Sequence, residues 1–307
     1  MVTIVHGSDL HFGKPHDPEV AEAFLESAHE LSPQVLVLSG DFTQRAKVRE
    51  YEAAQAFLER LPPVPRVVTP GNHDVPLYRV FERLFAPFRN YRTYIREELD
   101  TVTRVPGLTV VSLNTAAPRR AIVNGRIRSR QLRFARDAFR RAPAGDLRAV
   151  VAHHHLAPAP DYEKDHPLPR ARRVLDALKA MGVELVMGGH LHRAYIGNSL
   201  DVYPGKDRSR GIVIAQSGTT TSRRGRAREQ AKNSFNVVRL GEGYLEVTHY
   251  MYFSERGDFA PLSVHAFPRS PNRWFHRDRI IPASGAARAA TGEPPAPSGE
   301  PPMKDRR

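Results

Sequence analysis

Short runs of apolar residues recur along the chain. Most are separated by longer stretches in which apolar residues return every three or four positions. The first pattern is typical of buried strands and the second of helices with one buried face. Strands are predicted at residues 2–5, 35–39, 66–69, 108–113, 148–152 and 185–187, and helices at residues 17–31, 45–61, 129–141 and 170–180. This alternation favours an α/β protein with a parallel sheet and right-handed crossovers.

Asp17 and Pro18 mark the beginning of the first helix, because Asp is a common N-cap and Pro is common at the first helical position. Residues 76–100 predict another helix, which opens at Pro76 and is kinked or broken near Pro87. An apolar stripe runs along this helix, and we expect it to be core. The stripe consists of Leu77, Val80, Phe81, Leu84, Phe85 and Phe88.

After residue 192 the pattern changes to strands without intervening helices, at residues 194–197, 211–215, 234–240 and 244–252. They indicate a second, largely antiparallel sheet packed on the first. From about Pro282 the chain is rich in Pro, Ala, Gly and Ser, which is typical of disorder. We therefore predict a single domain over residues 1–280 and a disordered tail over residues 281–307.

The composition excludes several kinds of protein. With 307 residues, 40% of them hydrophobic, the chain can form a large core, and it has no cysteine for disulfides or thiolate metal sites. No apolar run is long enough to cross a membrane. A strand at Val2 and a ligand-type residue at Asp9 leave no room for a cleavable signal peptide, so we expect a cytoplasmic protein.

The net charge is +13, which favours anionic partners such as phosphate esters, nucleic acid or acidic lipid headgroups. A generally arginine-rich composition is the alternative, because the arginines are scattered. The arginines of the helix at 129–141 favour a solvated face over a nucleic-acid stripe, since no aromatic residues are interleaved as a stacking platform. The segment Ser217–Arg228 either cradles a phosphate or sugar or forms a solvated loop.

Residues that commonly bind metals follow five of the predicted strands. Open α/β sheets place their sites outside the carboxyl ends of their strands, so we expect these side chains to converge. Gly188 and Gly189 precede the last pair and let the backbone approach closely. In chain order the residues are Asp9 and His11, Asp41, Asn72 with His73 and Asp74, His153 with His154 and His155, and His190 with His192.

These ligands are too many for one ion, so the sequence predicts two divalent ions about 3.5–4 Å apart. Oxygen and nitrogen ligands without sulfur suit ions of the Mn, Fe or Zn type. Asp41 is the only acid at its strand end and is the best candidate for a bridging ligand. Two such ions clamp a phosphoryl group and activate a water that attacks phosphorus. His73 fits a catalytic role next to Asn72, with Asp74 placed to orient it.

Five motifs occur in this order: Asp9-x-His11, Gly40-Asp41, Gly71-Asn72-His73-Asp74, His153-His154 and Gly189-His190-x-His192. Together they resemble the motif set of the calcineurin-like metallophosphoesterases, over roughly residues 3–250. The resemblance implies a four-layer α/β/β/α sandwich with two mixed sheets flanked by helices. It also implies a catalytic His73, and His154 as a substrate contact or as the rival of His153. The implied ligands are Asp9, His11, Asp41 and His192 for one metal, and Asp41, Asn72, His153 and His190 for the other.

Within that family the run from Gly71 to Pro76 is most similar to the class III cyclic-nucleotide phosphodiesterases. The resemblance implies hydrolysis of small phosphodiesters, among them 3',5'-cyclic nucleotides, by a metal-bridging hydroxide. One alternative is a lipid-headgroup or nucleotide pyrophosphohydrolase. It needs an apolar groove near the site, for which Tyr244–Phe253 is the only hint. A nuclease or nucleic-acid-binding protein that uses the basic surface is another.

Overall fold

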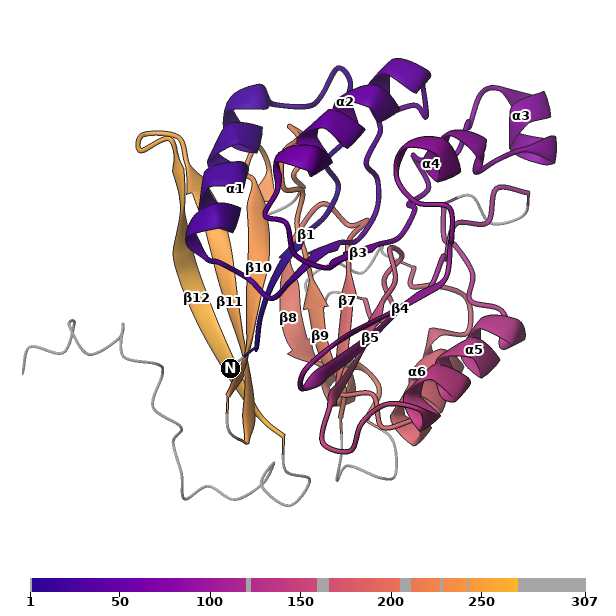
Figure 1. Cartoon of the computed structure of the whole chain (residues 1–307), viewed down its shortest axis with the longest axis vertical. Coiled ribbons are helices and arrows are strands. Elements are labelled where there is room, and N and C mark those ends of the chain that lie inside the picture. Colours follow the sequence, from indigo (N-terminus) through magenta and orange to yellow (C-terminus); the bar gives the residue numbers. More distant parts are fainter. Residues whose placement is uncertain are drawn as a thin grey trace, which may run out of the picture. The chain divides into compact units, whose positions relative to one another are not determined.

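Strands from both ends of the chain lie side by side in the first of two six-stranded sheets (Figure 1). The computed structural model describes residues 2–119, 123–158, 166–204, 211–226, 229–241 and 243–269. The order in the first sheet is β12 (Asp258–Pro268), β11 (Tyr244–Phe253), β10 (Ser234–Gly241), β1 (Val2–Gly7), β2 (Val35–Leu38) and β3 (Arg66–Val68). β1, β2 and β3 are parallel, and β10 joins β1 in the antiparallel sense.

The second sheet is also mixed. Its order is β4 (Thr101–Val105), β5 (Leu108–Ser112), β6 (Leu147–Val151), β7 (Leu185–Gly188), β9 (Val213–Gln216) and β8 (Tyr195–Asn198). The predicted second sheet, made of the strands after residue 192, is therefore wrong. β8 and β9 complete one sheet and β10–β12 complete the other, with the short helix α7 (Ser199–Val202) after β8. Hydrophobic periodicity marks a strand but does not identify its neighbour.

The two sheets pack face to face, and helices cover their outer faces, as the four-layer prediction required. Along β2, Val35 and Val37 point into the core between the sheets, whereas Leu36 and Leu38 pack under the helices. Both faces of the strand are buried, which explains its uninterrupted apolar run. The helices α1 (Pro18–Glu30) and α2 (Val48–Arg60) cover the first sheet, and α5 (Ser129–Arg140) and α6 (Ala171–Ala180) cover the second. The predicted N-cap is confirmed, because the Asp17 carboxylate accepts from the amide of Glu19.

The segment at 76–100 departs from the prediction. It contains two short helices, α3 (Val80–Phe85) and α4 (Arg89–Tyr94), so the predicted break near Pro87 is confirmed. The expectation that its apolar stripe is core is wrong, because Phe81 and Phe85 are 81% and 79% exposed. No residue of α3 is buried, and Figure 1 shows the helix at the edge of the fold, beside α4 and away from both sheets.

The described residues between 2 and 269 belong to one compact unit. The boundary predicted at residue 280 and the tail at 281–307 lie outside the described residues, so this division stays a prediction. None of the described helices is both long and apolar enough to cross a membrane. The cytoplasmic location also stays a prediction.

Candidate metal centre

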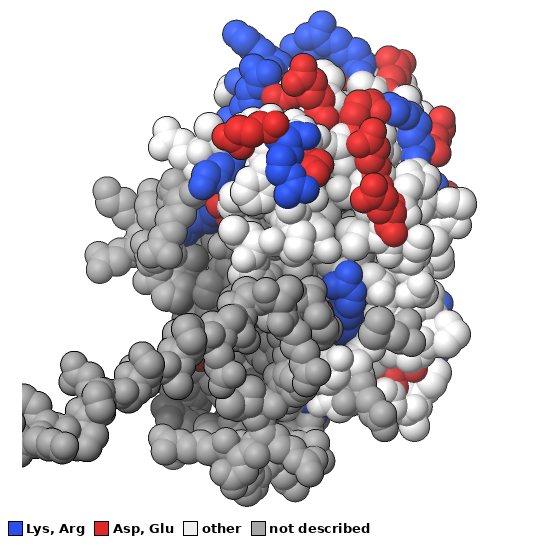
Figure 2. All heavy atoms as spheres, turned by 90° about the vertical axis from the view of Figure 1, so that its left-hand side faces the viewer, with Lys and Arg blue, Asp and Glu red and all other residues white. Residues whose placement is uncertain are grey.

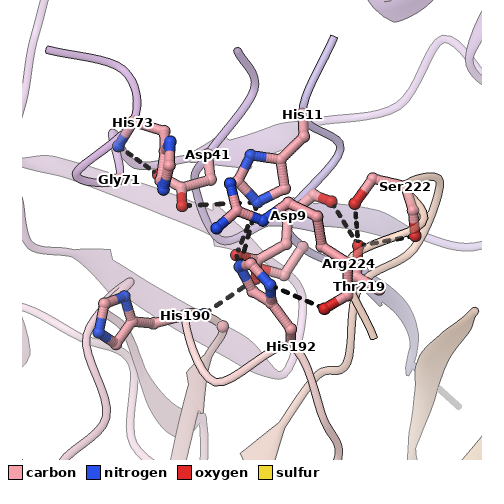
Figure 3. Close-up of polar contacts among 12 residues, drawn as sticks. Asp9, His11, Asp41, Gly71, His73, His190, His192, Thr219, Ser222 and Arg224 are labelled. Atoms are coloured by element: carbon pink, nitrogen blue, oxygen red, sulfur yellow. Dashed lines mark hydrogen bonds and ion pairs between the residues drawn. The ribbon is translucent and has the colours of Figure 1, made fainter. Parts of the chain in front are cut away.

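Side chains from the loops that follow β1, β2, β3 and β7 gather in one cluster (Figure 3), and His153, after β6, joins them beside Asp41. Because β1–β3 are parallel and β6 and β7 are parallel, their carboxyl ends lie at a common edge of each sheet. Backbone hydrogen bonds join the loops, such as the amide of Asp9 to the carbonyl of Gly40 at 3.0 Å. The amide of His190 also donates to Asp9 Oδ2 at 2.9 Å, which links the ends of the two sheets.

The backbone at the centre has an unusual conformation. Five of the predicted ligands have left-handed backbone, with φ of 56° at Asp9, 49° at His11, 54° at Asp41, 78° at His190 and 57° at His192. Residues other than glycine rarely adopt this conformation, and it persists where the surrounding structure enforces it, often at functional sites. The sharp turns direct each side chain back over the end of its strand.

Two glycines allow the loops to come this close. A Cβ atom at Gly71 would overlap the carboxylate and backbone of Asp41, and one at Gly189 would overlap the side chains of Ser8 and Asp9. Glycine is therefore required at both positions by close approach and not by a positive φ.

One set of side chains, the first ligand group, consists of Asp9, His11, Asp41 and His192. They are buried, and each offers one ligand atom such that all four atoms lie within 4.8 Å of one another. His192 Nε2 lies 3.1 Å from both Asp9 Oδ1 and His11 Nε2. His11 Nε2 in turn lies 3.5 Å from Asp9 Oδ1. Nitrogen and oxygen lone pairs that face one another at this spacing are the arrangement of a divalent metal site.

The second ligand group consists of Asp41, Asn72, His153 and His190. Asn72 Oδ1 lies 2.9 Å from His190 Nδ1 and 3.3 Å from His153 Nε2. Asp41 Oδ2 is common to both groups, because it lies 3.4 Å from His153 Nε2 and 3.7 Å from His11 Nε2. The geometry thus brings together all seven predicted metal ligands around one shared carboxylate.

The residues present fit bound cations. Asp9 Oδ1 and Asp41 Oδ2 are buried and have no hydrogen-bond partner within the described part of the chain. Burial raises the pKa of Asp9, but the nearby His192 and His11 outweigh this effect and hold it well below its usual range. Burial lowers the pKa of His153, and the charge of Asp41 raises it to about 9. The two carboxylates therefore create a negative potential that a cation would neutralise.

Second hydrogen bonds fix the orientation of two of the imidazoles. His153 Nδ1 donates to the carbonyl of Ser39 at 2.7 Å, and His192 Nδ1 donates to the carbonyl of Arg224 at 3.1 Å. A proton on Nδ1 leaves Nε2 as the lone-pair nitrogen directed at the centre. The protein thus supplies these ligands in the tautomer that binds metal.

His73 lies beside the shared carboxylate. Its amide donates to Asp41 Oδ1 at 2.8 Å, and its Nδ1 donates to the carbonyl of Gln44 at 2.9 Å. The prediction that Asp74 orients His73 is wrong. Asp74 is buried, and its carboxylate accepts from the amides of residues 42, 43 and 71, so it holds the loop of Asp41 in place. Consecutive side chains on this turn point in opposite directions.

His154 is buried behind the centre. Its Nδ1 lies 2.7 Å from Thr115 Oγ1, and its ring packs against that of His190 with centroids 4.6 Å apart. The geometry places His153, and not His154, against Asp41 and Asn72. It gives His154 a supporting position and does not place it among the side chains that line the cavity described below.

The hydroxyl residues of the loop from Ser217 are buried and do not form a phosphate cradle. Thr219 Oγ1 donates to the carbonyl of Asp9 at 2.8 Å, and Thr221 Oγ1 donates to that of Leu10 at 3.0 Å. Thr220 Oγ1 accepts from the amide of Ser8 at 2.9 Å. These side chains stabilise the left-handed turn that carries Asp9, a role that the sequence analysis missed.

Arg224, from the same loop, extends into the cluster of ligands (Figure 3). Its Nη1 donates to Gln44 Oε1 at 2.9 Å. Burial lowers the pKa of Arg224 below its usual value, and the charges of Asp41 and Asp9 oppose this effect in part. The only sequence signal for Arg224 was its position, three residues after a Thr-Thr-Thr run on a loop that returns to the first strand.

A cavity of about 650 Å³ opens over the centre. Its floor includes Asp41, Asn72, His190 and His192, and His73 and Arg224 also line it. On another part of the surface, Figure 2 shows positive and negative side chains intermingled in the upper part of the face. Among the described residues of that upper part, acidic side chains interrupt the basic ones, unlike the continuous basic patch of a nucleic-acid-binding surface.

Residues 2–194 match the family model for calcineurin-like phosphoesterases, so the chain belongs to the calcineurin-like phosphoesterase family. Members of this family are hydrolases, and the buried Asp/His cluster described above is a candidate divalent metal site. A search of curated protein sequences finds no match.

Solved structures share the fold at low sequence identity. A purple acid phosphatase from yellow lupin (Lupinus luteus) is 12% identical with a TM-score of 0.65, and the match covers 87% of this chain and 53% of the lupin chain. This chain therefore spans about half the length of that enzyme. A dimetal phosphatase from Danio rerio is 12% identical with a TM-score of 0.62, covering 88% and 99% of the two chains. PhoD is 12% identical with a TM-score of 0.60, covering 85% and 71%.

Proposed function

We propose that the chain hydrolyses phosphodiesters with two divalent metal ions, one in each ligand group. The observation that carries the proposal is the position of Asp41 Oδ2. This oxygen is buried, has no hydrogen-bond partner in the described residues, and lies between His11 Nε2 and His153 Nε2. A carboxylate oxygen between two sets of ligands is suited to bridge two cations.

The donor set is oxygen and nitrogen only, which suits ions of the Mn, Fe or Zn type. When bound, the ions supply positive charge to the phosphoryl oxygens and lower the pKa of water at the site. The chain itself orients the ligands, because the carbonyls of Ser39 and Arg224 hold two imidazoles in the metal-binding tautomer.

His73 is the proposed proton donor to the leaving oxygen. It lines the cavity, and the bond from Nδ1 to the carbonyl of Gln44 leaves Nε2 as the nitrogen that can exchange a proton with substrate. The ring lies 4.9 Å from that of His11, centroid to centroid, so it stands beside the first ligand group without entering it.

Arg224 is the proposed phosphate contact. Its guanidinium is partly buried over two carboxylates and is held from one side by Gln44. A planar guanidinium with free N–H groups matches the geometry of phosphoryl oxygens. The cavity of about 650 Å³ is larger than a phosphate group and has room for the two ester substituents of a diester, such as a cyclic nucleotide.

The test compares three substrates with purified protein supplied with Mn²⁺: bis-(p-nitrophenyl) phosphate, p-nitrophenyl phosphate and cyclic AMP. We expect turnover of the diester that is lost on chelation and restored by Mn²⁺. Asp41→Asn should lower the turnover of the diester by at least about 10³-fold, because the shared ligand is removed. Asp146→Asn is the matched control, since Asp146 is a buried acid that accepts from Thr109 Oγ1 at 2.7 Å, outside both ligand groups.

Full activity in Asp41→Asn, or turnover that ignores chelation, would show that the two-metal proposal is wrong. Turnover of the monoester alone would keep the metal centre and reject the diester specificity. Hydrolysis of the aryl diester without cyclic AMP would exclude cyclic nucleotides and leave other diesters as substrates.

A further inference from the structure

Helix α3 is oriented differently from the helices that cover the two sheets, whose apolar sides are buried. Its apolar side chains face solvent, with exposed fractions of 81% for Phe81 and 79% for Phe85, and with Val80 and Leu84 also exposed. We call these four residues the α3 face. Isolated exposed apolar side chains are common on proteins, but four on one short helix form a contiguous patch.

Arginine side chains hold the opposite side of α3 against the protein. Arg79 Nη2 donates to the carbonyl of Ala46 at 2.8 Å, and Arg83 Nη1 donates to that of Leu77 at 2.7 Å. The Arg79 bond reaches the loop before α2, whereas the Arg83 bond stays within the segment that leads into α3, so Arg79 attaches the start of the helix to the fold.

A third arginine, from another segment, joins them. Arg119 Nε donates to the carbonyl of Leu84 at 2.9 Å. Hydrogen bonds from charged donors are stronger than those between neutral groups. Arg79 and Arg119 thus tie the two ends of α3 to other segments, while its apolar side chains stay exposed.

The α3 face continues into the mouth of the cavity over the metal centre. Leu77 and Tyr78, which precede α3, line that cavity, as does Val123. Tyr78 is 70% exposed and Val123 is 64% exposed. Whatever covers the α3 face therefore lies next to the entrance through which substrate reaches the metal centre.

The size and charge of this region favour a lipid surface over a protein. A stable protein interface uses about 20–30 residues on each side, whereas the exposed apolar residues of this region number six in the described part of the chain. Residues 77–92 carry four arginines and one glutamate, and Arg89 and Arg92, on the next helix α4, are exposed. Aromatic side chains flanked by cations are the composition of segments that lie in the headgroup region of anionic bilayers.

We propose that the α3 face, with Tyr78 and Val123, docks on the surface of an anionic lipid bilayer and holds the mouth of the cavity against the headgroups. Phe81 and Phe85 enter the boundary between headgroups and acyl chains, and Arg89 and Arg92 contact the anionic headgroups. Docking would present headgroup phosphodiesters to the metal centre, and in this respect it rests on the proposed function. Vesicle binding can nevertheless be measured without catalysis.

The experiment is flotation of the full-length, Mn-supplied protein with vesicles of phosphatidylcholine that contain phosphatidylglycerol, and with vesicles of phosphatidylcholine alone. We expect binding to the anionic vesicles, and a loss of at least about tenfold in partitioning for Phe81→Ser/Phe85→Ser. Leu262→Ser/Val264→Ser is the matched control, because these β12 side chains are also exposed, at 54% and 46%, but lie on a different element. The control should bind as the wild type does.

Turnover of bis-(p-nitrophenyl) phosphate in all variants separates the two proposals, because Phe81 and Phe85 do not line the cavity. Unchanged turnover with lost flotation supports docking. No flotation of the active wild-type protein, or equal flotation of Phe81→Ser/Phe85→Ser, would overturn it. A concentration-dependent dimer that only the Phe81→Ser/Phe85→Ser variant loses, without vesicle binding, would instead assign the face to a second copy of the chain. Inactive protein that still floats would reject the phosphodiesterase proposal alone.

Discussion

The loops of the metal centre line the cavity, helix α3 follows Leu77 and Tyr78 of its lining, and the two regions are built in opposite ways. The loops bury charged and polar side chains, and left-handed backbone at Asp41 and His192 directs them inward. Helix α3 exposes apolar side chains and uses arginines to bind itself to the protein. In each region the side chains lie where burial by the hydrophobic effect alone would not place them.

The difference shows what each region is organised to do. Buried lone pairs cost free energy unless a partner satisfies them, so the unpaired oxygens of Asp9 and Asp41 imply a cation. Exposed aromatic rings such as Phe81 cost less, but they gain free energy only when an apolar partner covers them. The loops therefore need rigid geometry, and α3 needs an accessible surface.

The largest effect within this comparison is expected at the metal centre, from His73→Asn. If His73 protonates the leaving oxygen, turnover of a diester with an alkyl leaving group should fall by about 10²–10⁴-fold. A p-nitrophenyl ester should be affected much less, since its leaving group needs no proton. Metal content, measured by mass spectrometry of the purified protein, should stay near the wild-type value. Loss of metal would instead make His73 a ligand.

Next in size is a contrast in stability between two phenylalanines. Phe24 on α1 is fully buried and packs against Phe235 with ring centroids 5.1 Å apart, so Phe24→Ala should lower the free energy of unfolding by about 3–5 kcal/mol. Phe81→Ala on α3 should change it by less than about 0.5 kcal/mol. Guanidinium denaturation followed by circular dichroism measures both. Equal destabilisation would mean that the α3 face is covered in the free protein.

The ligands could be placed from sequence because parallel strands deliver their carboxyl ends to one edge, so an apolar run followed by Asp41 or His153 carries positional information. Asp74 was misassigned because adjacency in sequence says nothing of side-chain direction on a sharp turn. Thr219 was missed because its partner, the carbonyl of Asp9, lies 210 residues away in the chain. Contacts between a hydroxyl and a distant backbone leave no local pattern.

The fold was predictable where both faces of a strand are buried, and less so at the edges. β4 and β12 are the outer strands of their sheets, and their burial alternates incompletely, so neither has a continuous apolar run. The stripe on α3 has correct helical spacing, but periodicity identifies an apolar face without showing what it contacts. The contacts that tie α3 to other segments, made by Arg79 and Arg119, could not be predicted from this spacing.

Arg224 lines the cavity together with the ligands of the metal centre and Tyr78, and its replacement is expected to have the smallest effect. As a phosphate contact, it should bind substrate in the ground state and the transition state alike, so Arg224→Met should raise KM by about tenfold with little change in kcat. Arg223→Met is the matched control, because Arg223 is exposed and pairs with Asp17 at 2.9 Å on the surface. Steady-state kinetics with bis-(p-nitrophenyl) phosphate measure both. A fall in kcat with unchanged KM would show that Arg224 acts only in the transition state. Loss of vesicle binding in Arg224→Met would instead extend the docking surface from α3 into the cavity.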